Sequence, residues 1–220
     1  MKAHPLTGLI AAAARLISGV QVRWVDSGPD PRQAVYFANH SSHLDFVVLW
    51  SSLPAEVRAL TRPVAAQDYW NAGFRRALAV NVFRAVLVAR HAGKSEGREG
   101  SADQTLADPA SDPLLAIEHM LEAMGDTESL ILFPEGTRGT GGEVAAFKSG
   151  LYYLCRQRPG LRLIPAYLSN LNRILPKGEV LPVPFISQLT FGPAIVLEAD
   201  ETKPAFLARA RESVCRLRTI

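Results

Sequence analysis

The 220-residue sequence predicts a single α/β domain with a largely parallel or mixed central sheet flanked by helices. Two observations lead to this fold class. Short apolar runs rich in strand-forming residues recur along the chain, and segments of about ten residues with helical periodicity lie between them. This alternation is typical of α/β domains. A composition of 48% hydrophobic and 20% charged residues is that of a globular chain, and it excludes disorder of the whole protein.

The first element is a short apolar helix, predicted over Leu6–Val20 and followed by the main domain, residues 21–220. Arg15 interrupts this apolar run, which is far shorter than the ~20 residues needed to span a bilayer. Only Lys2 supplies positive charge ahead of it, so a secretory signal peptide is not expected either. Two alternatives stay open for residues 1–20: a helix packed on the core, or an interfacial helix with its apolar face in lipid.

The remaining elements alternate along the chain. Strands are predicted over Val20–Val25, Ala34–Ala38, Ala85–Ala89, Ser129–Phe133 and Leu161–Ala166. Helices are predicted over His43–Trp50, Phe74–Phe83, Leu114–Met124, Ser149–Gln157 and Lys203–Ile220. Residues 91–113 have no apolar period and predict a mobile surface loop, and residues 171–184 predict an irregular segment. The loops that follow the strands should meet at one edge of the sheet, where such sheets bind ligands.

Charge is divided unequally between the two parts of the chain. The net charge is +3, but residues 1–94 hold eleven basic and five acidic side chains, whereas residues 95–220 hold thirteen and sixteen. A basic half favours an anionic partner, which would be a phosphorylated substrate, a nucleic acid or an anionic lipid surface. The basic residues are not interleaved with aromatic ones, so nucleic acid is the least expected of the three.

The segment Asn39-His40-Ser41-Ser42-His43-Leu44-Asp45 is the first candidate site. On a regular helix, His40 and Asp45 would diverge by about 140°. They can meet only if His40 lies in a turn before the helix, and Asn and Ser residues after the predicted strand supply such a turn. An imidazole held by a carboxylate at one nitrogen is a general base at the other. The alternative is a capping Asn39 beside a histidine with a purely structural role.

The second candidate site follows the strand predicted over Ser129–Phe133 and runs from Phe133 to Gly142. Pro134 and Gly136 turn the backbone sharply at the sheet edge, and Glu135 and Arg138 are then presented from a loop. The planar guanidinium of arginine suits a phosphate monoester, and exposed loop amides would add to anion binding. The alternative is a glycine-rich turn with a local Glu–Arg pair.

Together these segments resemble the glycerolipid acyltransferase family, whose best-known members acylate lysophosphatidic acid. The family motif N-H-x-x-x-x-D is matched by Asn39, His40 and Asp45, and F-P-E-G-T-R is matched at all six positions by Phe133–Arg138. The order of the motifs and their separation of about ninety residues are also similar. Two weaker blocks agree, an apolar strand that ends at Arg90 and the proline-containing strand Leu163–Ala166.

The resemblance implies an O-acyltransferase that moves a fatty acyl group from acyl-CoA or acyl carrier protein to a lysophospholipid hydroxyl. The implied acceptor is 1-acylglycerol-3-phosphate and the product phosphatidic acid. The acyl thioester is a co-substrate, and no resident cofactor or metal is implied. The implied catalytic residues are His40, as general base, and Asp45, which orients it. The implied substrate-binding residues are Arg90, Glu135, Gly136, Thr137 and Arg138, with the Gly136 amide as a candidate oxyanion donor.

Other catalytic designs fit the sequence less well. The G-x-S-x-G match at Gly93–Gly97 lies in the predicted loop 91–113 and not in a turn between a strand and a helix, so it is no nucleophile elbow. Cys155 falls within a predicted helix, so a covalent acyl-enzyme is not expected. Outside the first motif the histidines are His4, His91 and His119, which form no second metal-binding cluster. Two functional alternatives stay open: an acyltransferase for another lysolipid or an amino-acid lipid, and a non-catalytic, membrane-peripheral lipid-binding protein.

The expected location is cytoplasmic, peripheral on the cytoplasmic face of the membrane. Cys155 and Cys215 are too few for a disulfide framework, which indicates a reducing compartment. The expected partners are the lysophospholipid, the acyl thioester, an anionic membrane surface and, as the alternative donor, acyl carrier protein. No nucleic acid is expected.

Overall fold

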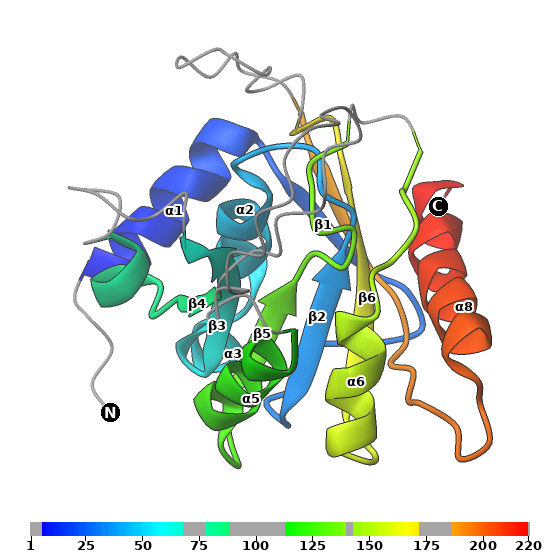
Figure 1. Cartoon of the computed structure of the whole chain (residues 1–220). Helices are drawn as coiled ribbons and strands as arrows, with labels where there is room; N and C mark the ends of the chain where they lie inside the picture. Colours follow the sequence, from blue (N-terminus) through cyan, green and yellow to red (C-terminus); the bar gives the residue numbers. More distant parts are fainter. Residues whose placement is uncertain (1–5, 68–77, 89–112, 140–142, 172–185, 220) are drawn as a thin grey trace, which may run out of the picture.

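The computed structural model describes residues 6–67, 78–88, 113–139, 143–171 and 186–219, and its centre is a seven-stranded sheet (Figure 1). The strand order across the sheet is β1-β7-β6-β2-β5-β3-β4. The strands are β1 (Gln21–Trp24), β2 (Ala34–Ala38), β3 (Thr61–Ala66), β4 (Val86–Val88), β5 (Ser129–Leu132), β6 (Arg162–Ser169) and β7 (Gln188–Phe191).

The sheet is mixed, with one antiparallel pairing. Strands β6, β2, β5, β3 and β4 pair in parallel, in that order. Strand β7 pairs antiparallel with β6, and β1 pairs in parallel with β7, so these two run against the other five. The predicted fold class, a single α/β domain with a largely parallel or mixed sheet, is confirmed.

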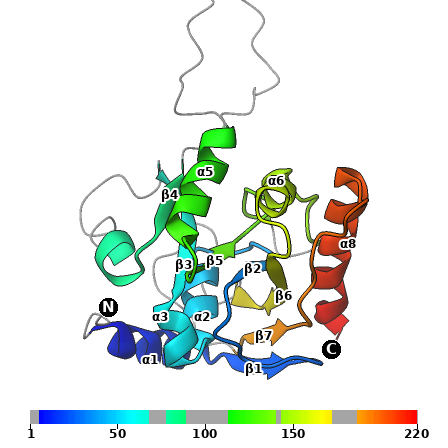
Figure 2. The same cartoon turned by 90° about the horizontal axis from the view of Figure 1, so that it is seen from below.

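Helices cover both faces of the sheet (Figure 2). One face carries α1 (Leu6–Ser18), α2 (Asp45–Ser52) and α3 (Ala55–Ala59). The other carries α5 (Pro113–Met124), α6 (Gly150–Gln157) and α8 (Lys203–Arg216), which continues into the 3-10 turn η4 (Leu217–Thr219). A π-helical turn, η2 (Leu78–Val82), precedes β4.

Strand β2 lies at the middle of both cores, since all five of its residues are fully buried. Tyr36 packs with the helices of one face, whereas Val35 and Phe37 pack with those of the other. A strand covered on both sides reads as a continuous apolar run rather than an alternating one. For this reason the sequence predicts β2 with its observed bounds.

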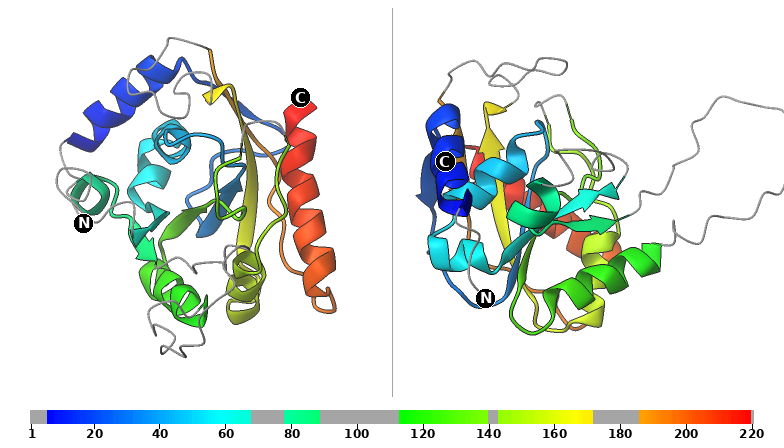
Figure 3. Two further views of the ribbon diagram at one scale, coloured as in Figure 1. Left: turned by 45° about the horizontal axis from the view of Figure 1, so that its top comes forward. Right: turned by 90° about the vertical axis from the view of Figure 1, so that its left-hand side faces the viewer.

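The N-terminal helix packs against the domain with one side and exposes apolar side chains on the other. Helix α1 lies beside α2 at the outside of its layer, with Ala11 fully buried (Figure 3). Its other side exposes Leu9, Leu16 and Ile17, which are 67%, 85% and 49% exposed. Among the helices that the structure describes, none is long and apolar enough to cross a membrane.

The predicted elements differ from the observed ones in several places. Strands β3 and β7 and helix α3 were not predicted, because β3 carries Arg62 and Pro63 and the other two are only four and five residues long. Within the helix predicted over Phe74–Phe83, the structure shows a π-helical turn that begins at Leu78. Residues 74–77 lie outside the described ranges. Most of the predicted loops 91–113 and 171–184 also lie outside them.

Candidate active site

The site begins where β2 ends. The Asn39 side chain donates to the Leu168 carbonyl at 2.9 Å and accepts from the Leu168 amide at 2.8 Å. It thereby continues the β2–β6 pairing one step beyond the last strand partners, Ala38 and Ala166. Because Asn39 is buried, these two bonds fix the point at which the chain leaves the sheet.

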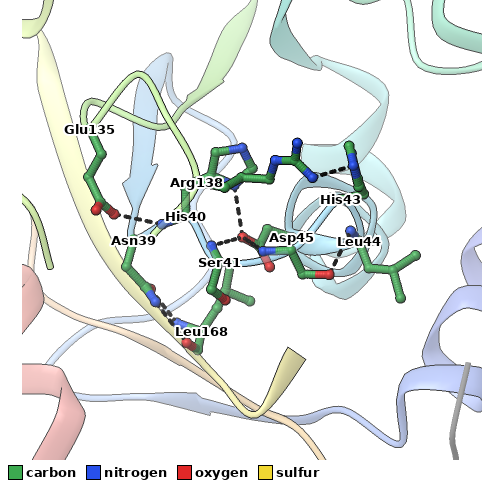
Figure 4. Close-up of polar contacts among 10 residues, drawn as sticks. Asn39, His40, Ser41, His43, Leu44, Asp45, Glu135, Arg138 and Leu168 are labelled. Atoms are coloured by element: carbon green, nitrogen blue, oxygen red, sulfur yellow. Dashed lines mark hydrogen bonds and ion pairs between the residues drawn. The ribbon is translucent and has the colours of Figure 1, made fainter. Parts of the chain in front are cut away.

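His40 and Asp45 meet as the turn before the helix predicts. His40 Nδ1 lies 2.9 Å from Asp45 Oδ2, and this oxygen also accepts the amides of Ser41 at 2.6 Å and Ser42 at 2.9 Å (Figure 4). Asp45 is fully buried and is the first residue of α2. Because the carboxylate oxygen accepts, Nδ1 carries the proton and Nε2 is left unprotonated in the neutral ring.

The His40 ring lies at the surface of the site. It stacks on Phe133, which follows β5, with ring centroids 4.4 Å apart. Its side chain is 21% exposed, and no described residue forms a hydrogen bond with Nε2. The ring therefore presents one nitrogen for proton transfer while its other side is held by the carboxylate.

Glu135 joins the two motif segments. Its carboxylate accepts the His40 amide through Oε1 at 2.7 Å and the Ala145 amide through Oε2 at 2.9 Å. A further bond of 2.8 Å runs from the Gly139 amide to the His40 carbonyl. The sequence predicts Glu135 as a substrate-binding residue, but the side chain is buried and both oxygens are occupied by backbone amides. The structure instead gives it a positioning role.

Gly136 lies where the loop turns back under Lys148. Its φ of +71° favours glycine, and a Cβ there would lie 2.8 Å from Lys148 Cδ and Cε. The Gly136 amide donates to the Phe133 carbonyl at 3.0 Å, so it is engaged in the turn rather than free for an oxyanion. Lys148 was not predicted as a site residue. The signal that could have identified it is the short segment between the loop and the helix predicted from Ser149, because few residues there could cover this turn.

Arg138 brings the second motif to the first. It is exposed, and its Nη1 forms a hydrogen bond with Nε2 of His43 in the turn before α2 (Figure 4). Thr137 is exposed in the same loop. Arg90, the remaining predicted binding residue, lies outside the described residues.

Two further features limit the chemistry. A cavity of about 10 Å³ between Asn39, Glu135 and Tyr167 has room for one water molecule at most, so the reacting lipid must bind outside it. Cys155 is buried, and burial raises the pKa of its thiol to about 12. That thiol is protonated and unreactive at neutral pH. Within the described ranges, no group of three or more His, Cys, Asp or Glu side chains is placed to hold a metal ion.

Comparisons with known proteins identify sequence relatives of this chain. The chain is 28% identical over 188 residues to 1-acyl-sn-glycerol-3-phosphate acyltransferases of Limnanthes douglasii and Limnanthes alba. The alignments cover 82% of this chain but 56% of each relative, so the chain spans just over half of their length.

The fold is shared with a solved structure. It is similar to the crystal structure of the 1-acyl-sn-glycerophosphate (LPA) acyltransferase PlsC from Thermotoga maritima, with a TM-score of 0.70 and 16% identity. The match covers 97% of this chain and 77% of the other. A family model described as Acyltransferase matches residues 19–169, a range that contains both motifs. The resemblance indicated by the two motifs is therefore confirmed, and the chain belongs to the acyltransferase family.

Proposed function

We propose that the protein transfers a fatty acyl group from an acyl thioester to the free hydroxyl of 1-acylglycerol-3-phosphate and so forms phosphatidic acid. The observation that carries this proposal is the pairing of His40 with the buried Asp45 beside Arg138 at one edge of the sheet. A base and a phosphate-binding cation together match an acceptor with both a hydroxyl and a phosphate. The names of the two plant relatives support the same acceptor.

His40 acts as the general base. Its Nε2 takes the proton of the acceptor hydroxyl as the oxygen attacks the thioester carbonyl, and Asp45 stabilises the imidazolium that forms. The tetrahedral intermediate then collapses, the carbon–sulfur bond breaks, and the imidazolium returns its proton to the thiolate. The products are the new ester and a free thiol, and His40 is neutral again for the next turnover.

Attack proceeds directly from the acceptor, without an acyl-enzyme. The buried, protonated Cys155 thiol is unsuited to carry the acyl group. His40 has instead an open ring nitrogen to which a hydroxyl can be presented. Holding the hydroxyl close to the thioester carbonyl then supplies the rate enhancement that a covalent intermediate would otherwise give.

The phosphate of the acceptor binds at Arg138. An exposed guanidinium offers several N–H donors in a plane, a geometry that suits two phosphate oxygens at once. Lys148 lies against Gly136 in the same loop and adds a second positive charge. These cations fix the acceptor so that its hydroxyl reaches His40.

Helix α1 brings the site to the lipid surface. Leu9, Leu16 and Ile17 form an exposed apolar strip along a helix too short to span a bilayer, which suits burial at the interface. The basic excess of residues 1–94 would favour anionic lipid. We place the enzyme peripherally on the cytoplasmic face, with acyl-CoA or acyl carrier protein as donor.

An acceptor panel tests the proposal. Purified protein is incubated with radiolabelled acyl-CoA and, in turn, 1-acylglycerol-3-phosphate, lysophosphatidylcholine, lysophosphatidylethanolamine and monoacylglycerol. We expect labelled phosphatidic acid as the main product, formed at least about a hundredfold more slowly by His40→Ala. Preferred labelling of another acceptor, or no labelling at all, would overturn the proposed function.

A further inference from the structure

His43 and Arg138 form a contact that the proposed chemistry does not use. His43 is half-buried in the turn between β2 and α2, and Arg138 reaches it from the loop after β5 (Figure 4). A guanidinium has N–H donors and no acceptor, so Arg138 Nη1 must donate and His43 Nε2 must accept. His43 therefore carries its proton on Nδ1.

The backbone around His43 is held in place on both sides. Just before it, the amides of Ser41 and Ser42 donate to Asp45, and just after it α2 begins. His40 belongs to the same short segment, so its ring and the His43 ring are fixed to one rigid turn. An arginine bound to His43 is consequently held at a set place relative to the catalytic base.

From this geometry we infer that His43 is a positioning residue that orders Arg138 for the acceptor phosphate and thereby makes the enzyme selective for phosphorylated acceptors. The inference rests on the proposed function. Without His43, the exposed Arg138 side chain would sample many rotamers and would have to be ordered during substrate binding. Ordering one such side chain weakens binding by about 3- to 10-fold. One Nη1 hydrogen serves His43, and the remaining donors stay available to phosphate.

Two substitutions separate the hydrogen bond from the bulk of the ring. In His43→Gln the side-chain oxygen can accept near the position of Nε2, whereas His43→Ala removes the acceptor. We expect His43→Ala to raise the KM for 1-acylglycerol-3-phosphate by about 3- to 10-fold, with the effect on KM rather than kcat. The KM for acyl-CoA should stay the same, and His43→Gln should restore most of the acceptor affinity.

An acceptor that lacks phosphate provides the selectivity test. With monoacylglycerol, kcat/KM should be alike in the wild type, His43→Ala and His43→Gln. In an Arg138→Ala background, His43→Ala should add no further rise in KM, because the inferred effect of His43 on the acceptor is exerted through Arg138. The inference is overturned if His43→Gln is as impaired as His43→Ala, or if His43→Ala still raises the KM when Arg138 is absent.

A readout that does not depend on activity distinguishes this inference from the proposed function. Nitrogen-15 NMR of the imidazole should show the His43 proton on Nδ1 in the wild type and a shift toward Nε2 in Arg138→Ala, with His43→Gln identifying the signal. An unchanged tautomer would overturn the inference even if phosphatidic acid is formed. The expected tautomer change without any phosphatidic acid would overturn the proposed function, and with it the acceptor role of this pair.

Discussion

The backbone amide of His40 donates a 2.7 Å hydrogen bond to Oε1 of Glu135, ninety-five residues further along the chain. The other oxygen of Glu135 accepts the Ala145 amide at 2.9 Å. One buried carboxylate thus joins His40, the loop after β5 and the segment that leads to α6. The two motifs are therefore parts of one structural unit as well as of one site.

Glu135→Gln tests this link. The amide group that replaces one oxygen cannot accept a backbone N–H, so a buried donor loses its partner, which lowers the unfolding free energy by about 1–3 kcal/mol. We expect a lower midpoint in chemical denaturation and a lower kcat. Glu143→Gln, at an exposed carboxyl in the following segment, is the matched control and should change neither. Wild-type stability and kcat in Glu135→Gln would contradict the linking role.

Gly136→Ala and Gly160→Ala form a second matched pair. The two glycines have φ of +71° and +76°, so an alanine at either position should lower the unfolding free energy by about 1–2 kcal/mol. Only at Gly136 would the new Cβ meet Lys148. Both variants should therefore lose similar thermal stability, while only Gly136→Ala should lose acyl transfer. Equal activity of the two variants would show that the packing of Lys148 on Gly136 has no part in catalysis.

Membrane attachment is tested on the exposed side of α1. Leu9 and Leu16 are 67% and 85% exposed, so the double variant Leu9→Gln/Leu16→Gln should fold normally. Loss of two leucines from a lipid interface should weaken co-sedimentation with anionic vesicles by about tenfold or more. Val196→Gln, at an apolar side chain that is 42% exposed on another part of the surface, is the control and should bind like the wild type. Unchanged binding by the double variant would place the interface elsewhere.

Direct attack by the acceptor predicts that the Cys155 thiol takes no part in acyl transfer. Burial raises the pKa of this thiol to about 12, so iodoacetamide at pH 7.5 should react with the partly exposed Cys215 and leave Cys155 unmodified. Mass spectrometry locates the modification, and an acyl-transfer assay follows it. Cys155→Ala should retain kcat, although it leaves a small gap in the core. An acylated Cys155 trapped during turnover would contradict direct attack.

The sequence predicts the elements that are buried on both faces or strongly periodic. Strand β2 and helices α5 and α6 have predicted bounds within one residue of the observed ones, because a continuous apolar run or a helical period leaves little choice. Strand β3 was not predicted because Arg62 and Pro63 interrupt its apolar pattern. In the folded protein, the pairing of β3 with β5 holds these two residues in the sheet. The direction of β7 depends on its pairing with β6, which no local pattern records.

The contacts of the candidate site could likewise be predicted only in part. His40 and Asp45 are close in sequence, so turn geometry alone predicts their contact. His40, which donates to Glu135, and His43, which contacts Arg138, each lie ninety-five residues away from their partner, and only the sheet brings the two segments together. Sequence reasoning therefore names these residues without their partners: it groups Glu135 with the substrate-binding residues, whereas the structure shows its carboxylate accepting two backbone amides.

The central claim is that His40, oriented by Asp45, is the general base. The most direct measurement is the kcat of His40→Ala with 1-acylglycerol-3-phosphate and acyl-CoA, with the fold checked by circular dichroism. General-base catalysis contributes about 10² to 10⁴ in rate, so we expect a loss of that size, and a smaller loss in Asp45→Asn, which leaves the base in place. A folded His40→Ala protein that retains more than half of the wild-type kcat would contradict the account.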